Sequence, residues 1–311
     1  MNGQKTRNSF LLFMAACIWG MAFVSQSKGM DYMGPFTFNG ARSVIGALAL
    51  LCYLAVRGLF TDTKNVNNQQ TNNKIDWKRS CKAGVLCGLV MAVASNLQQF
   101  GIQHTTVGKA GFITTLYIIF VPIAGLFFKK AVAGVVWVAA AMAAVGMYLL
   151  CMTESLSINS GDILVFLCAI AFTIHILVID HFAENTDGAL ISCIQFAVSG
   201  VLSCIAALIW EKPELVQLLD GMGTLLYAGV LSCGVAYTLQ IVGQKGVNPT
   251  IAALILSLES VVATIAGWVA FRIGFLQNDQ TLTTRQILGC VIVFAAVILV
   301  QLPAEWFSRK K

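Results

Sequence analysis

The feature that most constrains this chain is a series of ten apolar stretches, each about as long as a helix that crosses a bilayer. A crossing helix needs about 20 mostly apolar residues, and charged residues make up only 11% of the chain, against roughly 25% in a typical soluble domain. Backbone amides find no partner in hydrocarbon, so such stretches are predicted to be helices. The sequence therefore predicts an all-α polytopic membrane protein with ten transmembrane helices, at about residues 9–28, 34–57, 80–103, 107–128, 131–151, 161–181, 188–210, 221–244, 248–271 and 285–303.

The ten stretches form two sets of five that resemble each other. A shift of 142 positions carries the third and fourth stretches onto the eighth and ninth, so that Gln98 falls on Gln240 and Gly101 falls on Gly243. A shift of about 153 relates the first two stretches to the sixth and seventh more weakly. Because each set crosses the bilayer an odd number of times, the second set is inverted relative to the first. We therefore expect two inverted five-helix repeats, at residues 9–151 and 161–303, an arrangement typical of secondary transporters.

The fourth and ninth stretches each carry a stripe of mostly small residues, spaced three and four positions apart. Small residues let membrane helices approach closely. The two stripes are therefore expected to be packing seams, and they are also suited to be surfaces along which two halves of a transporter move. The stripes comprise Gly108, Gly111, Thr115, Ile118, Pro122 and Gly125, and then Thr250, Ala253, Ser257, Ser260, Thr264 and Gly267.

The basic residues are distributed unequally between the two sides of the predicted membrane. With a cytoplasmic N-terminus, 14 of the 20 Lys and Arg residues fall on the inner side and five on the outer side. By the positive-inside rule this distribution predicts cytoplasmic N- and C-termini in the cell (inner or plasma) membrane. Residues 61–80, which are rich in Asn, Gln and Lys, are predicted to form a cytoplasmic loop. Topology thus accounts for the net charge of +6, and nucleic acid is not an expected partner.

Ionisable residues inside a membrane span cost about 3 kcal/mol or more and are candidates for function. Glu259 lies about 16 Å into its span at 1.5 Å per residue. It could carry a proton or contact substrate, or it could be structural, paired with a cation such as Arg42 or held by hydroxyls. Arg42 could bind a carboxylate through two nitrogens, or it could hold its helix to neighbouring carbonyls. His175 could relay protons or be a packing residue.

Uncharged polar and aromatic residues in the spans are further candidates. Gln98 and Gln240 occupy equivalent positions near Asn96 and could line a polar cavity or form interhelical hydrogen bonds. Trp19 lies too deep for an interfacial belt and could be a cavity wall or a packing residue. Tyr117 is equivalent to Glu259 under the shift of 142, so the acid breaks the internal symmetry.

Several motifs, taken in order, resemble one family of transporters. They are Trp19-Gly20 with Lys28, Pro35 and Arg42, then Gly108-Lys-Ala-Gly111-Phe-Ile-Thr-Thr-Leu-Tyr117, then Tyr237-Thr-Leu-Gln240, and then Leu256-Ser-Leu-Glu259. The whole chain in this way resembles the EamA-type transporters of the drug/metabolite transporter superfamily. The resemblance implies ten helices in two inverted repeats, with a central cavity formed mainly by helices other than the fifth and tenth. It also implies movement of small metabolites, often amino acids and commonly outward.

The sequence therefore predicts a secondary transporter of a small organic metabolite, working by alternating access and possessing no cofactor or metal. Its expected partners are the small-molecule substrate, the lipid bilayer and, through Glu259, protons. A membrane-embedded transferase and a non-transporting sensor or scaffold are the alternatives. The substrate, the direction, the coupling ion and the oligomeric state stay open. The predicted substrate or ion pathway comprises Trp19, Arg42, Asn96, Gln98, Tyr117, His175, Tyr237, Gln240 and Glu259.

Overall fold

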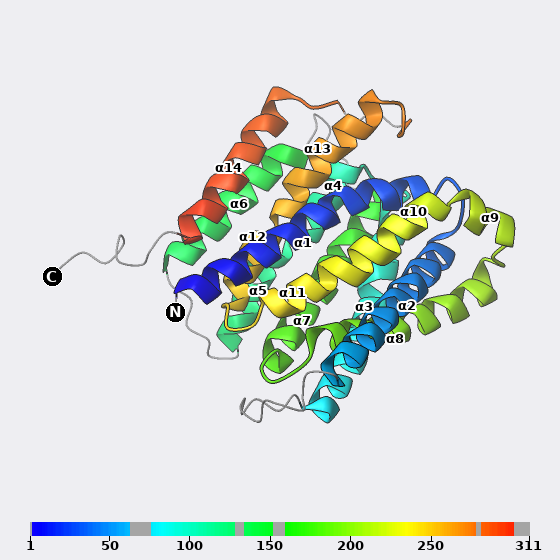
Figure 1. Cartoon of the computed structure of the whole chain (residues 1–311). Coiled ribbons are helices and arrows are strands. Elements are labelled where there is room, and N and C mark those ends of the chain that lie inside the picture. Colours follow the sequence, from blue (N-terminus) through cyan, green and yellow to red (C-terminus); the bar gives the residue numbers. More distant parts are fainter. Residues whose placement is uncertain (1, 63–75, 128–133, 152–158, 278–280, 302–311) are drawn as a thin grey trace.

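A computed structural model describes residues 2–62, 76–127, 134–151, 159–277 and 281–301, and within these ranges it contains helices and no strand (Figure 1). The all-helical prediction is confirmed. Eight helical segments are long and apolar enough to cross a bilayer, and two shorter apolar helices, Gly134–Leu149 and Thr284–Leu299, lie where the fifth and tenth spans are predicted. The first half contains α1 (Asn2–Gly29), α2 (Pro35–Asp62), α3 (Trp77–Ile102), α4 (Val107–Thr114), α5 (Tyr117–Phe127) and α6 (Gly134–Cys151).

The second half repeats this order with more interruptions. It contains α7 (Ser160–Phe182), α8 (Gly188–Trp210), the short α9 (Leu215–Asp220), α10 (Met222–Leu226), the π-helix η1 (Tyr227–Ala236), α11 (Tyr237–Gly243), α12 (Pro249–Leu256), α13 (Leu258–Arg272) and α14 (Thr284–Gln301).

Most of the loop predicted at residues 61–80 lies outside the described residues. Its two ends are helical, because α2 reaches Asp62 and α3 begins at Trp77. The start of α3 is fixed by Asp76, whose carboxylate accepts a hydrogen bond of 2.9 Å from the backbone N–H of Arg79. Such a cap satisfies one of the free N–H groups at a helix N-terminus.

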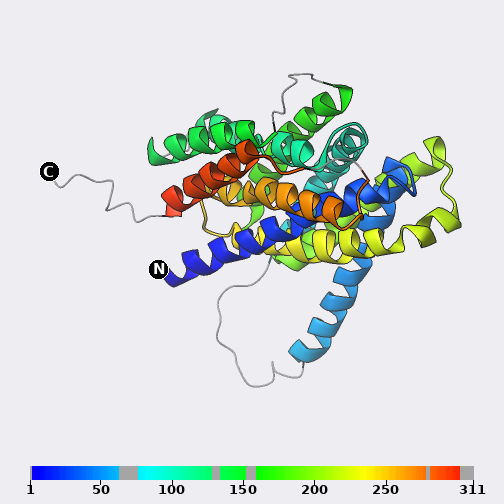
Figure 2. The same ribbon diagram turned by 90° about the horizontal axis from the view of Figure 1, so that it is seen from above.

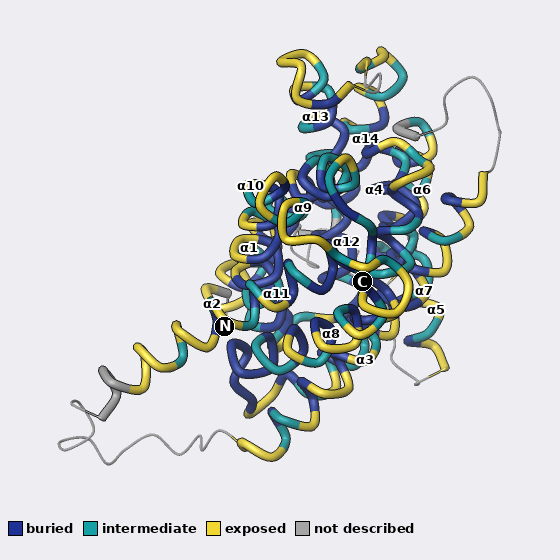
Figure 3. Tube along the Cα trace, turned by 90° about the vertical axis from the view of Figure 1, so that its right-hand side faces the viewer, coloured by how far each residue is buried: buried dark blue, intermediate teal, exposed yellow. Residues whose placement is uncertain are grey.

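The outer surface of the helix bundle is apolar. Figure 3 shows buried residues where helices face one another and exposed residues on the outward faces. Many of the exposed side chains are large and apolar, among them Leu48, Val93 and Leu208. A soluble protein rarely exposes so much contiguous apolar surface, whereas lipid contact requires it.

The two halves pack as related units. The α2 helix lies beside α8, and α6 lies beside α14, in the views of Figures 1 and 2. Both pairs are antiparallel. In the first, Gly40 contacts Cys204 near one end while Arg57 contacts Asp187 near the other. A twofold rotation about an axis perpendicular to the helices places equivalent helices side by side in this antiparallel way.

A second pair of contacts obeys the same rotation. The α3 helix packs on α7, and α11 packs on α1. A Cβ atom built on Gly101 would lie 2.8 Å from the carbonyl oxygen of Gly161, and one built on Gly243 would lie 3.0 Å from the carbonyl oxygen of Asn8. The shifts of 142 and 153 positions convert the first contact into the second. Glycine is required at both places because the facing backbone is too close for a side chain.

The second half contains one more residue than the first between two equivalent contacts, and the π-helix η1 accommodates it. Gly88 approaches the carbonyl oxygen of Gln195, and Gly229 approaches that of Arg42, with an ideal Cβ at 2.9 Å from the oxygen in both cases. These glycines are 141 positions apart, whereas the glycine pair of the preceding paragraph is 142 apart. The second half therefore has one more residue between the two contacts. A π-helix accommodates such an insertion by widening its turns, and η1 (Tyr227–Ala236) overlaps this interval.

The small-residue stripes of the fourth and ninth spans pack against each other at one end. A Cβ on Gly108 would lie 3.2 Å from the Thr264 hydroxyl oxygen, and one on Gly111 would lie 3.2 Å from the Ala263 Cβ. The predicted seam is therefore confirmed between α4 and α13. It does not extend along the whole stripe, because a Cβ on Gly125 would meet no described atom within 4 Å.

The α2–α8 pair is tied at both ends by carboxylates. At one end the Glu211 carboxylate accepts hydrogen bonds from the backbone N–H groups of Phe36 (2.9 Å) and Thr37 (2.7 Å) at the start of α2. At the other end Asp187 caps the start of α8 and forms an ion pair with Arg57. Burial acts to raise the pKa of the Asp187 carboxyl, but the bonds from Arg57 and from backbone N–H groups outweigh it and lower that pKa.

Candidate functional site

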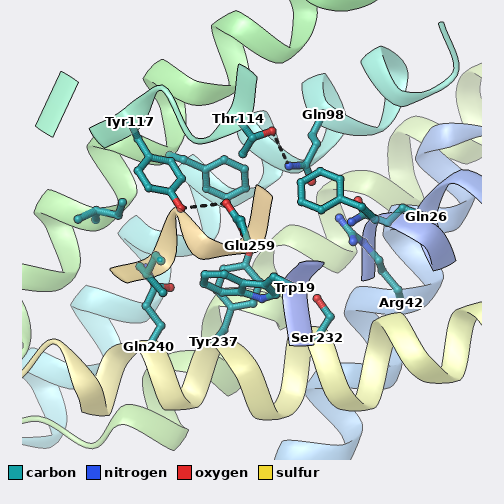
Figure 4. A pocket seen from close by; sticks show the side chains of 14 residues that line it. Trp19, Gln26, Arg42, Gln98, Thr114, Tyr117, Ser232, Tyr237, Gln240 and Glu259 are labelled. Carbon is teal, nitrogen blue, oxygen red and sulfur yellow. Dashed lines mark hydrogen bonds between the residues drawn. The ribbon is translucent and has the colours of Figure 1, made fainter. Parts of the chain in front are cut away.

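A cavity of about 460 Å³ lies between the two halves and is lined by fourteen residues (Figure 4). It is narrow, with space for only a few water molecules at a time. Helices α6, α8 and α14 contribute no lining residue, in agreement with the implication that the fifth and tenth helices stay outside the cavity. Ten of the lining residues form five pairs equivalent under the two shifts: Trp19 and Phe172, Phe23 and Ile176, Gln98 and Gln240, Thr114 and Leu256, and Tyr117 and Glu259.

The cavity therefore lies on the axis that relates the halves. Its four remaining lining residues have no lining equivalent, and they supply most of its asymmetry. Those residues are Gln26, Arg42, Ser232 and Tyr237.

Seven of the nine residues predicted for the pathway lie together in this cavity. They come from α1, α2, α3, α5, α11 and α13, which are far apart in the sequence. These seven are Trp19, Arg42, Gln98, Tyr117, Tyr237, Gln240 and Glu259.

Glu259 is held by the residue that occupies its own equivalent position. The Tyr117 hydroxyl donates a hydrogen bond of 2.9 Å to Glu259 Oε1, and the two residues are 3% and 4% exposed. The bond thus crosses the axis between the halves. No ion pair joins Glu259 to Arg42 in this conformation. The carboxyl group is bonded to a hydroxyl group instead, and its role in transport stays a prediction.

Both helices that carry this pair are interrupted just before it. The break between α4 and α5 centres on Thr115, and the break between α12 and α13 on Ser257, at equivalent positions. The Thr115 hydroxyl donates to the Phe112 carbonyl at 2.8 Å, and the Ser257 hydroxyl donates to the Leu254 carbonyl at 2.7 Å. Hydroxyl bonds to the preceding turn compete with the helical ladder and bend membrane helices. Interrupted helices near the middle of a span are typical of transporter binding sites.

Arg42 has no charged partner in the described chain. It is 6% exposed, its guanidinium carbon lies 5.7 Å from the centre of the Phe38 ring, and its Nε has no hydrogen-bond partner. The cavity contains other buried polar atoms without partners, namely Trp19 Nε1, Gln26 Oε1 and Gln240 Oε1. Most buried polar groups in proteins are hydrogen-bonded, so four unpaired ones around one cavity indicate a place that water or a ligand occupies.

Aromatic rings form one wall of the cavity. The rings of Trp19 and Tyr237 have centroids 4.5 Å apart, and Tyr237 also packs edge-on against Phe196 at 5.0 Å. On the α3 side, the Gln98 amide donates to the Thr114 hydroxyl at 3.1 Å. The cavity therefore combines an aromatic wall with amides, one carboxyl group and one guanidinium (Figure 4).

The structure places two predicted pathway residues elsewhere. His175 is fully buried behind the wall, where its Nε2 lies 3.0 Å from Gln195 Oε1. Asn96 joins helices, because it accepts a hydrogen bond from Asn39 at 2.9 Å and donates one to the Ser203 hydroxyl at 2.9 Å. In this conformation both side chains contact other protein groups, and neither lines the cavity.

Sequence reasoning missed several lining residues. Thr114, Gln26 and Ser232 carry no charge and resemble ordinary helix residues, so hydropathy does not distinguish them. The shift of about 153 contained a usable signal, because it carries Trp19 to Phe172. Applying both shifts to every candidate would have identified Phe172 as a wall residue.

Comparisons with known proteins agree with this architecture. The family model described as "EamA-like transporter family" matches residues 7–152 and 159–302. An "Uncharacterized transporter" of Archaeoglobus fulgidus is 29% identical over 298 residues, which cover 94% of this chain and 84% of that protein. An "Uncharacterized transporter YoaV" of Bacillus subtilis is 21% identical over 301 residues, covering 94% and 95%. One crystal structure of a protein shares the fold with a TM-score of 0.73 at 14% identity, covering 97% of this chain and 99% of that one.

Proposed function

Because the chain belongs to the EamA-like transporter family, we propose that it carries a small organic metabolite across the cell membrane by alternating access. It is a multi-pass membrane protein of a transporter family. In the proposed topology the described helices make ten crossings in two inverted units, at residues 9–151 and 161–303. Helices α6 and α14 are the fifth and tenth crossings, and both termini are cytoplasmic.

The observation that carries this proposal is the position of the cavity on the axis between the halves. Five equivalent pairs line it, so an exchange of conformations between the halves would rebuild much of the same lining with access from the other side. Inverted repeats in transporters work in this manner. The cavity is narrow, so a substrate requires the helices to separate before it enters.

The lining supports a small polar substrate with an apolar part. Arg42, Glu259 and the two glutamines offer polar contacts, and Trp19 with its aromatic neighbours offers an apolar wall. An amino-acid-like metabolite satisfies both, and outward movement is the direction that we propose.

Transport through the cavity can be tested by filling it. Metabolites that stabilise the purified protein in a thermal-shift screen are loaded into proteoliposomes for counterflow. Gln98→Trp adds bulk to the cavity and should abolish counterflow. Leu48→Trp adds the same side chain at a position that is 56% exposed on the outer surface, and it should leave counterflow intact. Equal flux in both variants would refute transport through this cavity.

Proton coupling through Glu259 is the second element of the proposal. A buried carboxyl that exchanges one hydrogen-bond partner for another between two states is suited to carry a proton. Moving one charge through the membrane field is worth about 2.3 kcal/mol per 100 mV, which is enough to drive moderate accumulation. Counterflow is independent of a gradient, so Glu259→Gln should retain it while losing the pH dependence of net uptake. An unchanged pH profile in this variant would exclude Glu259 as the carrier.

A further inference from the structure

Arg42 is the group in the cavity that the described chain leaves without a counter-ion. The ion pairs among the described residues join Lys28 to Asp31, Arg57 to Asp187 and Lys109 to Asp162. A guanidinium stays protonated in proteins, so it cannot become neutral when it is buried. A positive charge therefore faces the cavity permanently.

The carboxyl group that also lines the cavity does not neutralise this charge. Glu259 is hydrogen-bonded to Tyr117 and forms no ion pair with Arg42. Figure 4 shows Arg42 beside Gln26 at one side of the cavity and the Glu259–Tyr117 pair at the other. The guanidinium of Arg42 and the carboxyl group of Glu259 are thus separate parts of the lining.

The residue equivalent to Arg42 in the other half is neutral, so packing at that place in the fold does not require a positive charge. The shift of 153 carries Arg42 to Gln195, whose side-chain oxygen lies 3.0 Å from His175 Nε2 outside the cavity lining. A neutral amide therefore serves at the corresponding place in the fold, whereas Arg42 faces the cavity.

We propose that Arg42 is a subsite for the carboxylate group of the transported molecule, with the Trp19 indole N–H as a second donor. This inference rests on the proposed function and names the substrate class as small organic carboxylates with an apolar remainder. The guanidinium binds a carboxylate through two parallel N–H···O bonds. Trp19 Nε1 is a buried donor without a partner in the same cavity, and the rings of Trp19 and Tyr237 contact the apolar remainder.

The test uses the full-length protein and a series of probes of similar size. The probes are leucine, 4-methylpentanoate, 4-methylpentanamide and isoamylamine, and binding is measured by thermal shift and calorimetry in detergent. The two carboxylates should bind, and the amide and the amine should bind at least tenfold more weakly, because a carboxylate forms charge-assisted bonds. Binding of all four probes with equal affinity, or of neither carboxylate, would overturn the subsite. This comparison needs no variant, so misfolding cannot obscure it.

Variants then test whether Arg42 is the source of the preference for carboxylates. Arg42→Gln should weaken carboxylate binding about 10- to 100-fold. Arg42→Lys keeps the positive charge but loses the two parallel N–H donors of the guanidinium, and it should weaken binding less. Arg272→Gln removes an exposed arginine from the end of α13 and should change nothing. A carboxylate preference that survives Arg42→Gln would refute the assignment.

Counterflow separates this inference from the proposed function. If carboxylates bind through Arg42 but no probe shows flux, the subsite is supported and the transport proposal fails. If the amide is exchanged as fast as the carboxylates, transport is supported and the carboxylate subsite is overturned.

Discussion

Substitution of either Gly101 or Gly243 by alanine should destabilise the protein, because the two glycines occupy equivalent contacts in the two halves. At Gly101 the new Cβ would lie 2.3 Å from Val165 Cγ2 and 2.8 Å from the Gly161 carbonyl oxygen. At Gly243 it would lie 2.9 Å from Leu12 Cγ and 3.0 Å from the Asn8 carbonyl oxygen. The side-chain atoms can rotate away, but the carbonyl oxygens move only if whole helices separate.

The expected cost follows from this geometry. Extra methylene-sized groups in a packed core cost about 1–3 kcal/mol. Alanine in place of glycine recovers up to about 1 kcal/mol of helix propensity. We therefore expect each variant to lose about 1–2 kcal/mol, with Gly101→Ala the worse because its contacts are shorter.

Reversible unfolding by SDS titration in mixed micelles measures this free energy. Gly223→Ala is the matched control, because Gly223 is exposed in α10 and a Cβ there would meet nothing within 4 Å. The control should be neutral or slightly stabilising. The reasoning is refuted if Gly101→Ala or Gly243→Ala is as stable as the control, or if only one of them loses stability.

Three further predictions concern individual bonds. Tyr117→Phe removes the donor to Glu259 and should cost about 1.5–3 kcal/mol of stability, since a buried carboxyl loses its hydrogen bond; unfolding titrations measure it. Glu211→Ala removes the cap from α2 and should cost about 0.5–2 kcal/mol, with faster amide hydrogen exchange confined to the first turn of α2. Asp187→Asn keeps a capping oxygen but loses the ion pair with Arg57, and it should cost up to about 1 kcal/mol at pH 7. Because the folded pKa of Asp187 is lowered, this difference should be fully present above pH about 4, near the unfolded pKa, and should vanish as the pH falls through the folded value.

Each of these has an outcome that contradicts it. A Tyr117→Phe protein as stable as wild type would mean that the bond across the axis contributes nothing. Uniform exchange along α2 in Glu211→Ala would contradict a local cap. A stability difference for Asp187→Asn that stays constant down to pH 2 would mean that ionisation of this carboxyl is not its cause.

Hydropathy and internal repetition predicted the elements of this fold well, because both are properties of the local chain. The length of each apolar run specified where helices lie, and the two shifts identified which positions of the two halves are equivalent, such as Gly101 and Gly243, before any packing was known. The interruptions at Thr115 and Ser257 were not predicted. A single hydroxyl in an apolar run has little effect on hydropathy, and whether it bends the helix depends on which carbonyl it contacts.

For the site, the sequence by itself determined which side chains are too polar to be buried in lipid. That is a matter of transfer energy, and it selected Arg42, Glu259 and the glutamines. Only the tertiary structure decided which of them meet. It joined Glu259 to Tyr117 across the axis and left Arg42 without a counter-ion, and it placed His175 and Asn96 against protein instead of the cavity. Such partnerships depend on how two halves of the chain, more than one hundred residues apart, rotate onto each other, and no local pattern in the sequence records that rotation.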